Sequence, residues 1–175
     1  YIQAVQSFAD IALKEGRDTY GPKRTPLFVD GINADTHAPV MWKSRDGHPW
    51  ALSDLGNQQV FFRTLVGLSA LTGDPRYKQA AADATRYALT NLMENGFLAW
   101  GGHMAYNATD DSVVCAEDKG RVHELKCHYP FYELMWEIDP DATKTLVENM
   151  WNGHVLDWSN LDFNRHGHPQ KMGRL

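Results

Sequence analysis

Two aspartate–proline pairs divide the apolar pattern of this chain into short helices, and they constrain its fold more than any other feature. Asp74-Pro75 follows a glycine, and Asp139-Pro140 follows an apolar segment that ends at Ile138. Aspartate is a favoured helix N-cap and proline fits the first turn, so each pair predicts a helix start directly after a helix end. Consecutive helices with almost no loop between them pack as antiparallel pairs. The pattern therefore predicts stacked helical hairpins.

The apolar periodicity places helices on both sides of these joints. Apolar residues three and four positions apart predict helices over 2–16, from 55 to 73, from 75 toward Gly96, around 131–138 and through 146–150. Residues 18–54 contain many turn and helix-breaking dipeptides and favour a long loop region. Within it, the extended segments 27–29 and 40–42 suit a small β-hairpin. We expect an all-α fold whose helical hairpins form part of an (α/α) barrel or toroid, with the long loops at its ends.

Length and composition fit one domain. The chain has 175 residues, of which 43% are hydrophobic and 22% charged, as in a globular protein with a core. It starts at Tyr1 within a helical pattern and ends without a closing element, so we expect residues 1–175 to be a single partial domain of a larger barrel. The net charge of −5 argues against nucleic acids and anionic membranes as partners. No secretory leader is recognisable, so the compartment stays open among periplasm, cytoplasm and the cell exterior.

Histidines are frequent, and most of them fall in polar and aromatic segments between the helices. The run from His123 through Glu124 to His128 differs from a zinc-protease helix, because histidines five apart lie about 140° apart around an α-helix. On a helix, Glu124 and His128 would share one face, which is also typical of a core histidine beside a carboxylate. Imidazoles and a carboxylate from separate segments can form an open site for Mn, Fe, Co, Ni or Zn. Four other histidines are expected to be ordinary loop residues: His37, His48, His154 and His168.

Three segments together resemble polysaccharide lyase family 2, a family of pectate lyases. They are Trp100-Gly-Gly-His103, the run from His123 to Trp136, and the run from Asp157 to Gly167. The order, types and spacing of His103, Glu124 and Arg165-His166 agree with that family's pattern. The resemblance is strongest over residues 97–168, and a full barrel of this family needs further helical pairs.

The resemblance implies an (α/α)7 barrel and a metal-dependent pectate lyase. His103, Glu124 and His166 would bind one divalent transition metal, with Mn expected first and Co, Ni, Zn or Fe as alternatives. Arg165 would be the Brønsted base that removes the C5 proton during β-elimination of an acidic 1,4-linked galacturonate substrate. A guanidinium is ordinarily protonated, with a pKa above about 12, so bidentate binding of a substrate carboxylate is the competing role for Arg165.

Residues around these segments are weaker candidates. Lys126 and Arg121 could neutralise neighbouring substrate carboxylates, although charges of this kind are commonly just solvated. Trp100 could stack on a sugar ring. His123 and His128 are candidates for orienting the metal ligands through hydrogen bonds.

Two other functions stay open on the sequence alone. A glycoside hydrolase on a related α/α barrel would use a carboxylate pair, for which the chain offers Asp157, Asp162, Glu133 and Glu137 without a spacing that singles out two of them. A non-catalytic sugar-binding or scaffold module would carry the same histidines and glutamate as structural residues. The products distinguish a pectate lyase from a glycoside hydrolase, because elimination leaves a conjugated double bond that absorbs ultraviolet light and hydrolysis leaves none.

Overall fold

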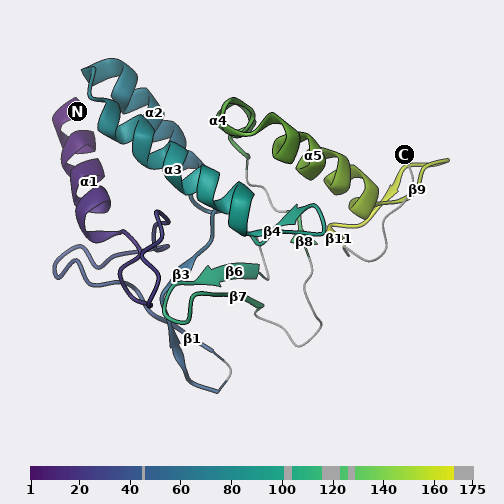
Figure 1. Cartoon of the computed structure of the whole chain (residues 1–175), viewed down its shortest axis with the longest axis horizontal. Helices are drawn as coiled ribbons and strands as arrows, with labels where there is room; N and C mark the ends of the chain where they lie inside the picture. Colours follow the sequence, from purple (N-terminus) through teal and green to yellow (C-terminus); the bar gives the residue numbers. More distant parts are fainter. Residues whose placement is uncertain (45, 101–103, 116–122, 126–128, 168–175) are drawn as a thin grey trace.

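Figure 1 shows the helices on one side of the molecule and the short strands and long loops on the other. The structure is a computed structural model, and it describes residues 1–44, 46–100, 104–115, 123–125 and 129–167. Within these ranges the helices are α1 (Ile2–Glu15), α2 (Gln59–Thr72), α3 (Pro75–Asn91), α4 (Tyr132–Ile138) and α5 (Pro140–His154). The helix starts expected at both Asp-Pro pairs are confirmed, because Asp74 and Asp139 are the N-caps of α3 and α5.

The part of the chain that the structure describes also contains eleven short strands. They are β1 (Trp42–Lys43), β2 (Pro49–Trp50), β3 (Leu52–Ser53), β4 (Met93–Glu94), β5 (Phe97–Leu98), β6 (Met104–Asn107), β7 (Ser112–Cys115), β8 (His123–Glu124), β9 (Val155–Asp157), β10 (Asp162–Phe163) and β11 (His166–Gly167). They form one three-stranded sheet, in the order β3-β6-β7, and the two-stranded pairs β1-β2, β4-β5, β8-β11 and β9-β10. All pairs are antiparallel.

The expected all-α fragment of an (α/α) barrel is therefore wrong, and the protein has a mixed α/β fold. The reason is the turn chemistry of residues 93–115 and 155–167. Asn95 and Gly96 have positive φ angles of 50° and 81°, a conformation that joins two strands tightly. Asp111 and Leu161, with φ angles of 53° and 57°, lie in the turns between β6 and β7 and between β9 and β10. A hairpin does occur within residues 18–54, but it pairs Trp42 with Trp50 rather than the two segments expected.

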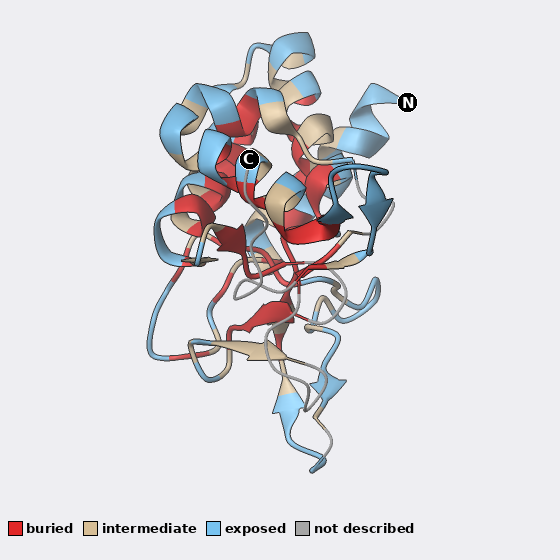
Figure 2. Ribbon diagram, turned by 90° about the vertical axis from the view of Figure 1, so that its right-hand side faces the viewer, coloured by how far each residue is buried: buried red, intermediate tan, exposed pale blue. Residues whose placement is uncertain are grey.

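The core lies between the helices and the strands below them, as the buried residues in Figure 2 show. Helix α2 contributes large apolar side chains, whereas α3 contributes mostly alanines, whose small size allows close helix packing. The β1–β2 hairpin is largely exposed at the opposite end of the view. The principal core residues on the helices are Phe62, Leu65, Leu68, Tyr77, Ala81, Ala84, Ala88, Leu134, Met135 and Leu146.

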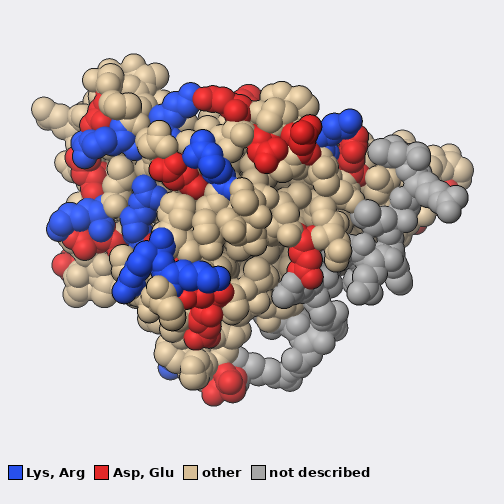
Figure 3. Space-filling view, in the orientation of Figure 1, with Lys and Arg blue, Asp and Glu red and all other residues tan. Residues whose placement is uncertain are grey.

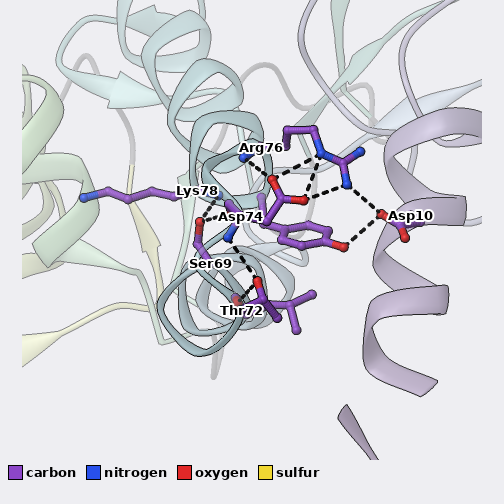
Figure 4. A network of polar contacts seen from close by, with 8 residues as sticks. Asp10, Ser69, Thr72, Asp74, Arg76 and Lys78 are labelled. Atoms are coloured by element: carbon purple, nitrogen blue, oxygen red, sulfur yellow. Dashed lines mark hydrogen bonds and ion pairs between the residues drawn. The ribbon is translucent and has the colours of Figure 1, made fainter. Parts of the chain in front are cut away.

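A polar network joins α2 and α3 to α1 (Figure 4). Gly73 ends α2 in the left-handed conformation, with φ 75°, which glycine adopts without a Cβ penalty. The Asp74 carboxylate accepts the Arg76 backbone N–H at 3.0 Å and pairs with the Arg76 guanidinium at 2.7 Å. The Tyr77 hydroxyl donates to Asp10 of α1 at 2.9 Å. The network therefore anchors α1 to the start of α3.

On the face shown in Figure 3, most Lys and Arg side chains lie over the left half, whereas Asp and Glu side chains are also spread along the upper edge toward the right. Ion pairs such as Lys78 with Glu137 and Arg86 with Asp83 neutralise some of them locally. Among the described residues on this face, basic and acidic side chains are therefore partly paired with one another. Among the described helices, none has both the length and the apolar character needed to cross a membrane.

Candidate functional site

Two short strands from distant parts of the chain form the centre of the site. Strand β8 pairs with β11 so that His166 lies opposite Glu124 and Gly167 lies opposite His123. The backbone N–H of Leu125 donates to the carbonyl of Arg165 at 2.9 Å, which extends the pairing. Successive side chains of a strand point to opposite faces, so Glu124 and His166 share one face while His123 lies on the other. The helix considered for Glu124 is wrong, because Glu124 lies in a strand.

On the face that Glu124 and His166 share, the buried carboxylate of Glu124 lies close to the side chains of Arg165 and His166. Only 3% of the Glu124 side chain is exposed. Its Oε1 lies 3.3 Å from Nη2 of Arg165 and 3.7 Å from Nε2 of His166. Burying a carboxylate is costly unless it is paired, so the guanidinium offsets part of that cost. The Arg165 side chain is itself 66% exposed and extends from the carboxylate toward solvent.

The opposite face carries a buried chain of hydrogen bonds. The indole N–H of Trp100 donates to Nε2 of His123 at 3.0 Å, and Nδ1 of His123 lies 2.8 Å from Nε2 of His154. Nδ1 of His154 lies 2.7 Å from the carbonyl oxygen of Asn164. Desolvation, with a smaller effect of neighbouring His154, lowers the pKa of His123 to about 3, and desolvation also lowers the pKa of His154. Both imidazoles are therefore neutral near neutral pH.

The structure brings together three of the four residues expected at the metal and base positions, namely Glu124, Arg165 and His166. Four candidates lie outside the described residues: His103, Arg121, Lys126 and His128. Within the ranges that are described, no group of three or more His, Cys, Asp or Glu side chains is arranged to hold a metal ion.

Trp100 and His123 occupy positions that differ from those expected. Trp100 is only 5% exposed and its N–H is bonded to His123, so its indole lies in the interior rather than on a sugar-facing surface. His123 lies behind Glu124, on the opposite face of β8, and bonds to His154 rather than to the carboxylate.

His154 is the residue that sequence reasoning missed. It is 1% exposed at the end of α5, whereas the sequence predicts an ordinary loop histidine. No sequence pattern identifies its partner, because the contact with His123 depends on how α5 packs beside β8 and β11. Asn164, which accepts from His154, was missed for the same reason.

A small cavity lies beside Glu124. Its volume is about 30 Å³, and its lining includes Trp100, His123, Glu124 and Met150. This volume holds a water molecule and is far too small for a sugar ring.

The carboxylates considered for a hydrolase have other partners or exposed positions. Asp157 and Asp162 face each other across β9 and β10 and are exposed. Hydrogen bonds from the Ser159 hydroxyl and backbone N–H lower the pKa of Asp157, the opposite of what a general acid requires. Glu137 is paired with Lys78 at 2.7 Å. The geometry of these residues does not favour a hydrolytic pair.

Comparison with known proteins shows the family to which the chain belongs. A family model described as periplasmic pectate lyase matches residues 25–174, which include both strands. A pectate disaccharide-lyase of Dickeya dadantii (strain 3937) is 35% identical over 169 residues, which are 95% of this chain and 31% of that relative. The chain thus spans about a third of the length of the curated relative it matches. It belongs to the periplasmic pectate lyase family.

Proposed function

We propose that the protein is a metal-assisted pectate lyase that cleaves 1,4-linked polygalacturonate by β-elimination. Membership of the pectate lyase family supports an acidic polysaccharide as the substrate. The single observation that carries the proposal is the contact of one buried carboxylate, that of Glu124, with both Arg165 and His166. These residues come from segments far apart in the sequence.

Glu124 and His166 fit a divalent transition metal, with His103 as the third proposed ligand. Carboxylate and imidazole donors suit Mn, which we propose as the ion, and also Co, Ni, Zn and Fe. Two donors bound to one ion at about 2.1 Å each lie no more than about 4.2 Å apart. The 3.7 Å between Nε2 of His166 and Oε1 of Glu124 is within this limit. A metal bound there would supply positive charge that neutralises the substrate carboxylate and stabilises the charge developing at C5.

Arg165 is the proposed base. Its guanidinium contacts the Glu124 carboxylate at 3.3 Å while two thirds of its side chain is exposed, so it can reach a substrate on the open side of the site. In β-elimination an unprotonated guanidinium nitrogen would accept the C5 proton. The electrons of the C5–H bond would form the C4–C5 double bond, the C4–O bond would break, and the leaving oxygen would take up a proton from water to become a hydroxyl group. In the competing role, a protonated Arg165 would bind a substrate carboxylate through two hydrogen bonds.

The activity is tested by incubating purified protein with polygalacturonate and Mn²⁺ and recording ultraviolet absorbance. We expect the absorbance of an unsaturated product, its loss on chelation of the metal, and a decrease of at least 100-fold in Arg165→Ala. Glu137→Gln is the matched control, since this exposed carboxylate lies on α4 and pairs only with Lys78 among the described contacts. New reducing ends without ultraviolet absorbance would show hydrolysis and refute the proposal.

The variant Arg165→Lys distinguishes the role of Arg165 as the base from its competing role in binding a substrate carboxylate. Lysine keeps a positive charge but cannot bind a carboxylate through a planar fork. If Arg165 is the base, Arg165→Lys lowers kcat with little effect on KM. A rise in KM at unchanged kcat would instead assign Arg165 to substrate binding.

A further inference from the structure

We propose that His123 and His154 are a positioning pair that fixes the backbone of residues 164–167, and so determines how Arg165 and His166 meet Glu124. The inference rests on the proposed function, because it concerns the placement of the residues proposed to act there. Neither imidazole touches substrate in this arrangement, since each is 1% exposed and lies on or behind the face of β8 opposite Glu124.

The groups at the two ends of the chain of hydrogen bonds determine the direction of every bond in it. An indole N–H only donates, so Nε2 of His123 must accept from Trp100. A carbonyl oxygen only accepts, so Nδ1 of His154 must carry a proton toward Asn164. A neutral imidazole has one N–H, and His123 therefore donates from Nδ1 to Nε2 of His154. All three bonds form only when both rings are neutral Nδ1–H tautomers.

His154 holds Asn164 from two directions. Its Nδ1–H donates to the Asn164 carbonyl at 2.7 Å, and its own carbonyl accepts the Asn164 backbone N–H at 2.9 Å. The Asn164 side-chain oxygen in turn accepts the backbone N–H of His166 at 2.9 Å. The Arg165 carbonyl is bonded to Leu125 at the end of β8. Residues 164–166 are thus tied both to α5 and to β8.

Close packing around the pair requires small or flat neighbours. A Cβ added to Gly167 would lie 2.6 Å from Nε2 of His154, the nitrogen that accepts from His123. The ring of Phe97 packs on His123 with centroids 4.8 Å apart, and Phe163 stacks on His154 at 5.9 Å. These contacts shield the hydrogen bonds from water, which strengthens them.

A ladder as short as β8 with β11 needs such support. Each strand has two residues, and an isolated two-stranded pair is marginally stable at best. The Arg165 side chain is largely exposed, so its own packing contributes little to its position. The hydrogen bonds from the buried pair supply the constraint that the ladder lacks.

Three variants test the pair. His154→Phe keeps a flat ring and removes the hydrogen bonds, whereas His154→Asn keeps a donor near the position of Nδ1. Gly167→Ala keeps every polar group but displaces His154. We expect His154→Phe and Gly167→Ala to lower kcat for the unsaturated product 10- to 100-fold, and His154→Asn to recover most of it. Leu146→Ala, a core change on the same helix, controls for stability and should leave kcat unchanged well below its melting temperature.

Two readouts do not depend on activity. NMR of the imidazole nitrogens should show Nδ1–H tautomers for both His123 and His154. Hydrogen exchange of the Leu125 amide, which donates to Arg165, should be faster in His154→Phe than in the wild type. An Nε2–H tautomer in either ring, or unchanged exchange at Leu125, would overturn the inference. A wild type that forms no unsaturated product would instead refute the proposed function and leave these two results to decide the role of the pair.

Discussion

Replacing Gly153 with alanine tests the close packing behind the candidate site. Gly153 is buried near the end of α5, and a Cβ there would lie 2.5 Å from Cζ of Phe97. Phe97 is 1% exposed and packs on His123, so its ring cannot turn toward solvent. Ordinary carbon contacts are about 3.5–4.0 Å, and the ring would have to move by roughly 1 Å.

Two opposing effects determine the change in stability. Alanine in place of glycine within a helix favours folding by up to about 1 kcal/mol, and less near a helix end. Overpacking a buried site costs about 1–3 kcal/mol. We therefore expect Gly153→Ala to lower the free energy of unfolding by about 1–2 kcal/mol. For a chain of this size that change lowers the melting temperature by about 2–8 °C.

Gly67→Ala is the matched control. Gly67 lies within α2, it is exposed, and nothing lies within 4 Å of an added Cβ. Only the helix propensity changes there, so we expect a gain of about 0.5–1 kcal/mol. Urea unfolding followed by circular dichroism should move the two midpoints in opposite directions at unchanged slope. Two midpoints that both rise would refute the packing of Phe97 against Gly153.

Three further predictions concern a helix cap, a buried acid and the proposed metal site. The Asp139 carboxylate caps α5 by accepting the Ala142 N–H at 2.9 Å. Asp139→Ala should lower the free energy of unfolding in urea by about 1 kcal/mol, whereas Asp139→Asn should lower it by only a few tenths of a kcal/mol. Equal losses in the two variants would contradict the cap. Desolvation, aided by the charge of Asp54, raises the pKa of Asp30 to about 6, so the wild type binds a proton on folding between about pH 4 and 6. Its melting temperature relative to Asp30→Asn should therefore rise as the pH falls from 6 to 4, and a fall would refute the raised pKa. Glu124→Gln should lower Mn²⁺ affinity at least tenfold in calorimetric titration, and unchanged affinity would remove the carboxylate from the metal site.

The helices follow from local chemistry, and for that reason the sequence predicts them well. Asp74 and Asp139 cap α3 and α5, Gly73 ends α2, and each of these effects acts within one helical turn. Most of the strands were missed because strands of two to four residues are too short to show a period. Their pairing depends on contacts such as that of Leu52 with Asn107, which no local pattern encodes.

The residues of the candidate site likewise differ in whether the sequence alone could identify them. Glu124, Arg165 and His166 were identified by the resemblance of three segments to a known family, and the structure brings these three together. The resemblance does not extend to His154, because its role depends on a buried contact between α5 and β8. The prediction that Trp100 stacks on a sugar ring rested on its aromatic side chain alone, and the structure instead buries this side chain in the interior.

The ladder of β8 with β11 has a consequence for folding, because it joins residues 123–124 to residues 166–167 across the whole of α4 and α5. Closing so large a loop costs entropy that is compensated only after both helices have docked. A partly unfolded state can retain all of its helices and still have Glu124 far from Arg165. We expect the proposed lyase activity to disappear at a lower urea concentration than the helical signal, so that its loss is the earliest sign of undocking.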